Sequence, residues 1–251
     1  MSLAVVTGGS GGIGRACAAR LLSAGHDVLL TGRNEETLAK AATDLGAGPG
    51  GGAVDVAAFD VTDEAAVEQH LRPLAVDVLV NNAGWANSAP LEKIPLGDWE
   101  AMLTVHATGA FLCIRAVLGG MRERDRGRIV TVASVAGLVG APYIAAYTAA
   151  KHAAIGLMRA TAAEVAGTGI TANAVCPGYV DTPMTDASVT RLAGRTGRSP
   201  EETRNALAST SPLGRLITPE EVAVAVAYLA SPEAAPVNGQ TIVLDGGGIF
   251  S

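Results

Sequence analysis

Short apolar runs alternate with longer helical segments along this chain, and this alternation constrains the fold more than any other feature. Runs rich in Val, Ile, Leu and Ala predict strands at residues 3–7, 27–32, 53–59, 76–80, 128–133, 170–175 and 240–244. The segments between them predict helices at 13–24, 35–45, 63–71, 96–122, 146–166, 185–209 with a break, and 219–230. Strands that are apolar on both faces need helices on both sides, so we expect a doubly wound, seven-stranded parallel α/β sheet.

The chain has the length and composition of one globular domain. It has 251 residues, of which 49% are hydrophobic and 17% charged, so it can bury a large core. The glycine-rich stretch 46–52 is short and predicts a surface loop between a helix and a strand. We therefore expect a single domain over residues 1–251.

Charge and cysteine content exclude several classes of partner. A net charge of −6 argues against nucleic acid, because binding to a phosphate backbone needs an excess of Lys and Arg. The start of the chain lacks a basic segment, and no apolar run reaches the roughly 18 residues that span a bilayer. Cys17, Cys113 and Cys176 lie too far apart for a metal-binding spacing and predict buried thiols in a reducing compartment. We expect a cytoplasmic protein without a metal site.

A glycine-rich turn follows the first predicted strand and opens the first predicted helix. Residues 7–14 read TGGSGGIG and contain a G-x-G-x-x-G match at Gly9, Gly11 and Gly14. At the first turn of a parallel sheet, glycines let the backbone approach a pyrophosphate, and free N–H groups at the helix start attract its charge. The turn predicts a Rossmann-like dinucleotide site.

The residue after the second strand indicates which dinucleotide binds. An acidic residue there accepts a hydrogen bond from the adenosine 2′-hydroxyl, whereas an arginine accommodates a 2′-phosphate. Here Gly32 stands at the acidic position and Arg33 follows it, although Glu35 and Glu36 lie nearby. We expect NADPH, with NADH as the alternative.

Five elements in order make the chain resemble the short-chain dehydrogenase/reductase family, from about residue 3 to the end. These elements are Thr7-Gly8-x-x-x-Gly12-x-Gly14, Asp60-Val61, Asn81-Asn82-Ala83-Gly84, Ser134 with Tyr147 and Lys151, and the segment Cys176 to Thr182. Within this family the chain is similar to bacterial 3-oxoacyl thioester reductases and polyketide ketoreductases. It implies a cofactor site formed by Thr7, Gly8, Ser10, Gly12, Ile13, Gly14, Arg33, Asp60, Val61, Asn82, Ala83, Gly84, Tyr147, Lys151, Pro177, Gly178, Val180 and Thr182.

The stretch Tyr147-Thr148-Ala149-Ala150-Lys151 is expected to carry the chemistry. Residues at i and i+4 share a helix face, so Lys151 can bring its charge near the Tyr147 hydroxyl and lower its pKa toward working pH. Tyr147 would then donate a proton to a ketone while Ser134 holds the ketone oxygen. The resemblance also implies that Lys151 holds the nicotinamide ribose.

One position departs from the family pattern. The family places an Asn in its fourth helix to order a water beside the lysine, and His106 takes that place here. Imidazole titrates near neutral pH, so His106 is expected to serve the same relay, and His106→Asn should then change the pH profile. The alternatives are a packing residue with the relay rerouted, or impaired catalysis.

The substrate pocket is expected to involve the apolar stretch 137–143 and the variable stretch 183–215. The latter contributes Arg191, Arg195, Arg198, Arg204 and Arg215 against three acids between residues 186 and 215, a local charge of +2. These arginines suit a phosphate-bearing thioester such as coenzyme A or a carrier-protein arm, or they are solvated helix faces.

The preferred hypothesis is an NADPH-dependent reductase of a β-ketoacyl thioester or a polyketide-like ketone. The first alternative is an NAD-dependent secondary-alcohol or 3-hydroxyacyl-CoA dehydrogenase that uses the same residues in reverse. A cofactor-binding regulatory protein without turnover is the alternative of another class. The resemblance further implies a homotetramer, with a dimer as the alternative. The small residues of the stretch 146–166 and the apolar ending 246–250 fit such burial.

Replacing Tyr147 by Phe should abolish turnover without abolishing cofactor binding, because only the proton donor is removed. Oxidation of NADPH by the purified protein with an acetoacetyl thioester, compared with NADH, measures this. A variant that retains the wild-type rate would exclude Tyr147 as the acid, and a preference for NADH would contradict the role given to Arg33.

Overall fold

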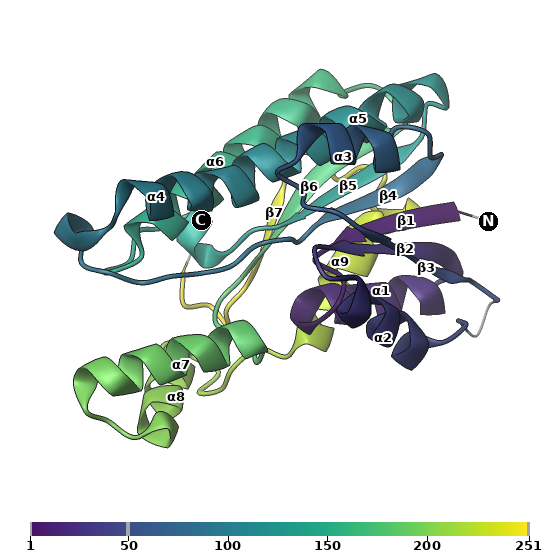
Figure 1. Ribbon diagram of the computed structural model, residues 1–251. Coiled ribbons are helices and arrows are strands. Elements are labelled where there is room, and N and C mark those ends of the chain that lie inside the picture. Colours follow the sequence, from purple (N-terminus) through teal and green to yellow (C-terminus); the bar gives the residue numbers. More distant parts are fainter. Residues whose placement is uncertain (1, 49–50, 250–251) are drawn as a thin grey trace.

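A computed structural model describes residues 2–48 and 51–249 and contains one parallel sheet (Figure 1). The strands are β1 (Ser2–Thr7), β2 (His26–Gly32), β3 (Val54–Ala58), β4 (Val76–Asn81), β5 (Gly127–Val132), β6 (Ile170–Pro177) and β7 (Thr241–Leu244). They lie in the order β3-β2-β1-β4-β5-β6-β7, and every pairing is parallel. The order reverses between β1 and β4, which is where open α/β sheets place their ligands.

Helices cover both faces of this sheet, as the strand pattern predicts (Figure 1). They are α1 (Gly12–Ser23), α2 (Glu35–Leu45), α3 (Glu64–Leu71), α4 (Leu96–Leu103), α5 (Gly109–Glu123), α6 (Ala145–Glu164), α7 (Pro183–Thr196), α8 (Pro200–Ala208) and α9 (Pro219–Ala230). Each predicted strand and helix is present within a few residues of its expected bounds. The break expected in 185–209 separates α7 from α8.

Two apolar clusters fill the two sides of the sheet. One contains Met121 of α5 and Met158 of α6 beneath the helices α3, α5 and α6. The other contains Leu21 of α1 and Leu229 of α9 beneath α1, α2 and α9. The three cysteines are buried with free thiols, as their spacing predicts.

Side-chain caps explain why several helices begin where they do. The Asn34 side chain accepts a hydrogen bond from the Thr37 N–H at 2.9 Å and starts α2. Thr218 and Glu221 form a reciprocal capping box at the start of α9, which satisfies two backbone N–H groups. The predicted loop 46–52 has no regular structure in its described residues, and residues 49 and 50 lie outside them.

A π-helical turn, Thr104–Thr108, joins α4 to α5 and makes them one winding segment. This 28-residue helix, Leu96–Glu123, has a window with mean hydropathy of 1.6 and few charges, enough by composition to cross a membrane. The expectation that no apolar run reaches that length is therefore wrong, because polar and charged residues interrupt this segment while its mean hydropathy stays high. Half of the window is buried inside the protein, which accounts for its apolar character as a core helix.

Helices α7 and α8 form a lobe that stands apart from the layered body (Figure 1). The chain leaves at Val180 and returns at Ile217, where the two residues pair in a short parallel bridge. The lobe has its own small apolar cluster, made by Val189, Leu207 and Leu216. It therefore does not depend on the two main clusters for its packing.

Replacing Leu79 by Ala should destabilise the protein by about 2–5 kcal/mol, because this β4 side chain is fully buried and leaves a cavity. Leu96→Ala is the matched control, since Leu96 is 70% exposed and its loss should cost under about 0.5 kcal/mol. Urea unfolding of both variants measures the difference. Equal losses would contradict this description of the core.

Candidate active site

The glycine turn between β1 and α1 needs glycine at positions 8, 12 and 14. Gly12 has φ +51°, a left-handed conformation that other residues rarely adopt. A Cβ on Gly14 would lie 2.2 Å from the Gly8 carbonyl oxygen, whereas one on Gly11 would meet nothing within 4 Å. A Cβ on Gly9 would lie 2.9 Å from the Leu30 Cδ2 atom, so Gly11 is the one glycine of the general pattern at positions 9, 11 and 14 that the packing does not require.

Hydrogen bonds fasten this turn to the end of β4. The Thr7 hydroxyl accepts from the Asn82 and Ala83 N–H groups at 2.9 and 3.0 Å. The Asn82 amide donates to the carbonyls of Thr7 and Gly8 at 3.0 and 3.1 Å. The first turn and the Asn-Asn-Ala-Gly element therefore form one rigid unit at the switch point of the sheet.

The start of α1 fits a dinucleotide phosphate. Its N-cap, Gly11, has no side-chain cap, and no acidic residue lies in the first turn. Free N–H groups and the helix dipole there favour an anion. Thr182 approaches from the opposite side, because a Cβ on Gly12 would lie 3.3 Å from its Cγ2. These residues form a cradle in which Ser10 is partly exposed.

The residues predicted for the adenosine end follow β2 and β3, the two strands beyond β1. Arg33 comes directly after β2, is exposed and makes no ion pair in the part of the chain that the structure describes. Asp60 and Val61 follow β3, and Asp60 accepts hydrogen bonds from the N–H and hydroxyl of Thr62 at 2.9 and 2.8 Å. All three lie at the carboxyl edge of the sheet.

One pocket of about 360 Å³ brings together the four predicted catalytic residues, Ser134, Tyr147, Lys151 and His106. Part of the predicted cofactor site lines the same pocket, namely Ile13, Asn82, Gly84, Pro177, Gly178, Val180 and Thr182. The others lie outside it, at or near the ends of β1 to β4, namely Thr7, Gly8, Ser10, Gly12, Gly14, Arg33, Asp60, Val61 and Ala83.

Ser134 and Tyr147 lie side by side in the lining of this pocket. Ser134 follows β5 and caps a short 3₁₀ turn by accepting from the Ala136 N–H at 3.1 Å. Burial raises the pKa of Tyr147 to about 12, although a hydrogen bond with Ser134 acts to lower it. The expectation that Lys151 lowers this pKa toward working pH is wrong here, because desolvation is the largest cause of the shift and raises the pKa. Tyr147 is therefore protonated at working pH, which suits a proton donor.

Lys151 lies beneath Tyr147, as their spacing on α6 predicts. Its Nζ lies 5.6 Å from the centroid of the Tyr147 ring and donates to the Val132 carbonyl at 2.8 Å. Burial lowers its pKa to about 8, and the nearby Cys176 acts to raise it. The ammonium group is thus poised to change charge close to physiological pH.

His106 lies in the π-helical turn, edge-on to the Tyr147 ring at 5.4 Å between centroids. Its Nε2 is 2.7 Å from the Trp85 carbonyl, and its buried Nδ1 has no partner among the described residues. Burial is the largest cause that lowers its pKa to about 3, and the Lys151 charge is the second. The expectation that His106 titrates near neutral pH is therefore wrong, and the imidazole is neutral.

Comparison with known proteins decides the family. The family model described as short chain dehydrogenase matches residues 2–192. The chain belongs to the short-chain dehydrogenase family. It is 36% identical to a D-beta-hydroxybutyrate dehydrogenase of Cupriavidus necator (97% of this chain, 96% of the relative). It is 37% identical to a 3-oxoacyl-(acyl-carrier-protein) reductase of Vibrio harveyi (98% and 96%).

A solved structure extends this likeness to three dimensions. A single-site variant of actinorhodin polyketide ketoreductase, crystallised with NADPH, superposes on the short-chain dehydrogenase described here with a TM-score of 0.94 at 36% identity. The match covers 99% of this chain and 98% of the other. The predictions of the family, the fold, an oxidoreductase acting on a ketone and NADPH as cofactor are confirmed by these findings.

The contacts that the arginines of residues 186–215 make in this short-chain dehydrogenase were not predicted from the sequence. Four of the five arginines in 186–215 are engaged. Arg204 pairs with Asp181 and Asp186, and Arg215 pairs with Glu221. Arg191 and Arg195 bind the segment 86–88 after β4. Carboxylates thus neutralise Arg204 and Arg215, and hydrogen bonds to uncharged groups engage Arg191 and Arg195. The local excess of arginine was the sequence feature that pointed to these contacts.

Replacing His106 by Asn should leave the pH profile of kcat/KM unchanged between pH 6 and 9, since the imidazole stays neutral and neither gains nor loses a proton in that range. Its effect on stability should appear as a loss at acid pH instead. The folded-state pKa lies below that of the unfolded chain, so stability is full above about pH 6.5 and is lost as pH falls toward 3. The wild type should lose roughly 3 kcal/mol more than the variant between pH 7.5 and 4, measured by urea unfolding. A profile that shifts near pH 7 would contradict this.

Proposed function

We propose that the protein reduces uncharged ketones, foremost 3-oxoacyl thioesters, with NADPH. The observation that carries this proposal is the character of the pocket around Ser134 and Tyr147. Among the described residues that line it, Lys151 is the single charged one, and its ammonium is hydrogen-bonded to the Val132 carbonyl. Within that lining, no other cation faces the site where the ketone would lie.

The apolar walls favour an acyl chain over a free acid. Val139, Ala141, Pro142 and Met184 line the pocket beyond the reacting groups. A carboxylate placed there would lose its hydration without gaining a counter-ion, which is costly. A hydroxybutyrate is such a carboxylate, so the lining favours a thioester reductase over the dehydrogenase activity named for one group of relatives.

Ser134 and Tyr147 can act together on the carbonyl oxygen. Both hydroxyls donate to that oxygen, which fixes the ketone and stabilises the negative charge as it develops. Bound NADPH supplies the hydride. Tyr147 then gives its proton to the new alkoxide, and its raised pKa of about 12 ensures that it holds this proton beforehand.

We propose that Lys151 holds the cofactor ribose and replaces the proton that Tyr147 loses. With a pKa of about 8, it carries an exchangeable proton near neutral pH. His106, neutral and bonded to the Trp85 carbonyl, contributes its free Nδ1 as a hydrogen-bonding group rather than as a charge. His106 therefore acts without titrating.

Arg33 is proposed to bind the adenosine 2′-phosphate. It follows Gly32, where an NAD-specific site would place a carboxylate, and the structure gives it no ion-pair partner among the described residues. The planar guanidinium can contact a phosphate through two N–H groups. The contacts proposed for Asp60 and Val61 with the adenine lie one strand further along the same edge.

We also propose a cytoplasmic homotetramer made of single-domain subunits over residues 1–251, with 183–215 as the substrate region. Exposed apolar side chains on α5 and α9 support the assembly, since Phe111, Val224 and Tyr228 are each 43–53% exposed. The part of the predicted apolar ending that includes Phe250 lies outside the described residues.

A pair of substrates that differ only in charge tests the proposal. We expect kcat/KM with NADPH to be at least about 100-fold higher for methyl acetoacetate or an acetoacetyl thioester than for acetoacetate, because only the acid must bury a charge. Initial rates at pH 7.5 measure this ratio. Equal or better use of the acid would refute the neutral-substrate assignment and favour a hydroxy-acid dehydrogenase.

A further inference from the structure

Arg191 of α7 reaches across to the segment after β4. Its Nη1 donates to the Asn87 side-chain oxygen at 2.9 Å, and its Nη2 donates to the Ala86 carbonyl at 3.0 Å. A third contact, from Nη2 to the Ser188 hydroxyl at 3.3 Å, keeps the guanidinium against its own helix. Ala86, Asn87 and Ser188 all line the substrate pocket, so Arg191 ties two of its walls together.

Asn87 is itself held from the opposite side. Its side-chain oxygen also accepts from the Ser88 N–H at 2.8 Å, and its amide nitrogen lies 3.3 Å from an Asp98 carboxylate oxygen on α4. Asn87, the partner that Arg191 binds, is therefore held by α4 independently of the lobe. Arg191 forms no ion pair within the residues that the structure describes, and its Nε is buried without a partner. A half-buried cation with such partners serves geometry more than net stability.

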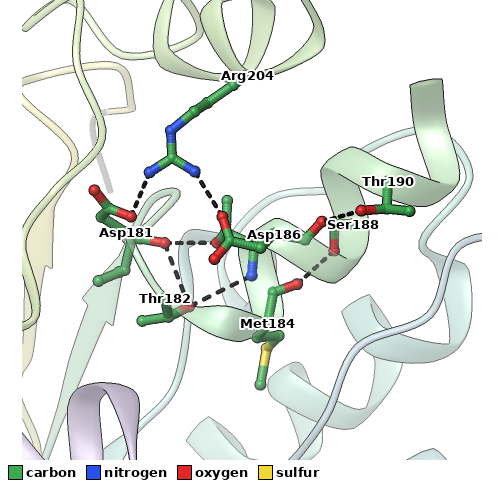
Figure 2. A network of polar contacts seen from close by, with 9 residues as sticks. Asp181, Thr182, Met184, Asp186, Ser188, Thr190 and Arg204 are labelled. Atoms are coloured by element: carbon green, nitrogen blue, oxygen red, sulfur yellow. Dashed lines mark hydrogen bonds and ion pairs between the residues drawn. The ribbon is translucent and has the colours of Figure 1, made fainter. Parts of the chain in front are cut away.

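A second group of contacts anchors the lobe at its base. Arg204 of α8 binds Asp181, beside the point where the lobe leaves the body, and Asp186 of α7 at 2.7 Å (Figure 2). Thr182 caps the start of α7 in the same network. Within the described residues, the hydrogen bonds from α7 to the segment 86–88 come from Arg191 and, through one contact at 3.2 Å to the Ser88 carbonyl, from Arg195.

We propose that Arg191 is a positioning residue that sets the width of the substrate pocket by clasping α7 to Asn87 and Ala86. The inference rests on the proposed function in that the pocket it shapes is the one assigned to the ketone. Met184, Thr185, Ser188 and Leu192 of α7 form one wall, and each keeps its distance from Tyr147 through this clasp. The dinucleotide cradle at Gly12 and Gly14 lies outside it.

The test compares Arg191→Met with Arg198→Met. Methionine keeps much of the length but loses all the N–H donors, whereas Arg198 lies in the same lobe, is exposed and makes no side-chain hydrogen bond with the described residues. For Arg191→Met we expect the KM for methyl acetoacetate, which has no phosphate for Arg198 to bind, to rise roughly tenfold to hundredfold, with a smaller change in kcat. The Kd for NADPH, from fluorescence titration, should stay within about twofold. Arg198→Met should match the wild type in all three.

A double-mutant cycle with Asn87→Ala separates the clasp from a general loss of structure. If Arg191 acts through Asn87, the double variant should show a KM close to that of Arg191→Met alone, because the second change removes a contact already lost. Additive effects, or a parallel loss of NADPH affinity, would overturn the proposal.

Hydrogen exchange keeps the inference separate from the substrate assignment. Amides in residues 183–196 and 86–89 should exchange faster in Arg191→Met than in the wild type or Arg198→Met, whether or not a thioester is turned over. If the wild type fails to reduce any thioester yet this difference is present, the substrate class is wrong and the clasp stands. Unchanged exchange in both segments would refute the clasp.

Discussion

The bonds from Thr7 to Asn82 and Ala83 hold together the two strand ends on which the rest of the site depends. β1 and β4 are neighbours in the sheet, yet these bonds join residues 75 and 76 positions apart along the chain. One side of this joint leads into the glycine turn and α1, and the other leads into the wall formed by residues 84–88. Because the Thr7 hydroxyl and the Asn82 amide join both parts, the phosphate cradle and the substrate wall keep a constant relation to each other.

The charges in this pocket follow from burial more than from pairing. Tyr147, Lys151 and His106 lie within one apolar shell, and desolvation is the largest cause of each of their pKa shifts. Each group is thereby driven toward its uncharged form, phenol, amine or imidazole. A site made in this way keeps the Tyr147 phenol protonated, and the same cost of desolvation acts against the burial of a charged substrate.

Much of this could be predicted from sequence, since the information is local. The bounds of α2 and α9 follow from the caps Asn34 and Thr218, and the sheet follows from apolar runs bounded by turns. Tyr147 and Lys151 share a face because of helix periodicity alone. The direction of the pKa shift on Tyr147 could not be predicted, because it depends on how many distant segments enclose the phenol. The long-range partners of Arg191 and Arg204 could not be predicted either, because they lie outside the helices that carry these two arginines.

The π-helical turn that carries His106 also determines the rotation of α5 about its own axis. An i to i+5 turn accommodates one residue more than α-helical winding, which rotates the later side chains by about 100°. α5 has the rotation that packs Gly109 against Val61 and buries Met121. A deletion of one residue within Thr104–Thr108 would therefore turn that apolar face toward water, even with Ser134, Tyr147 and Lys151 intact.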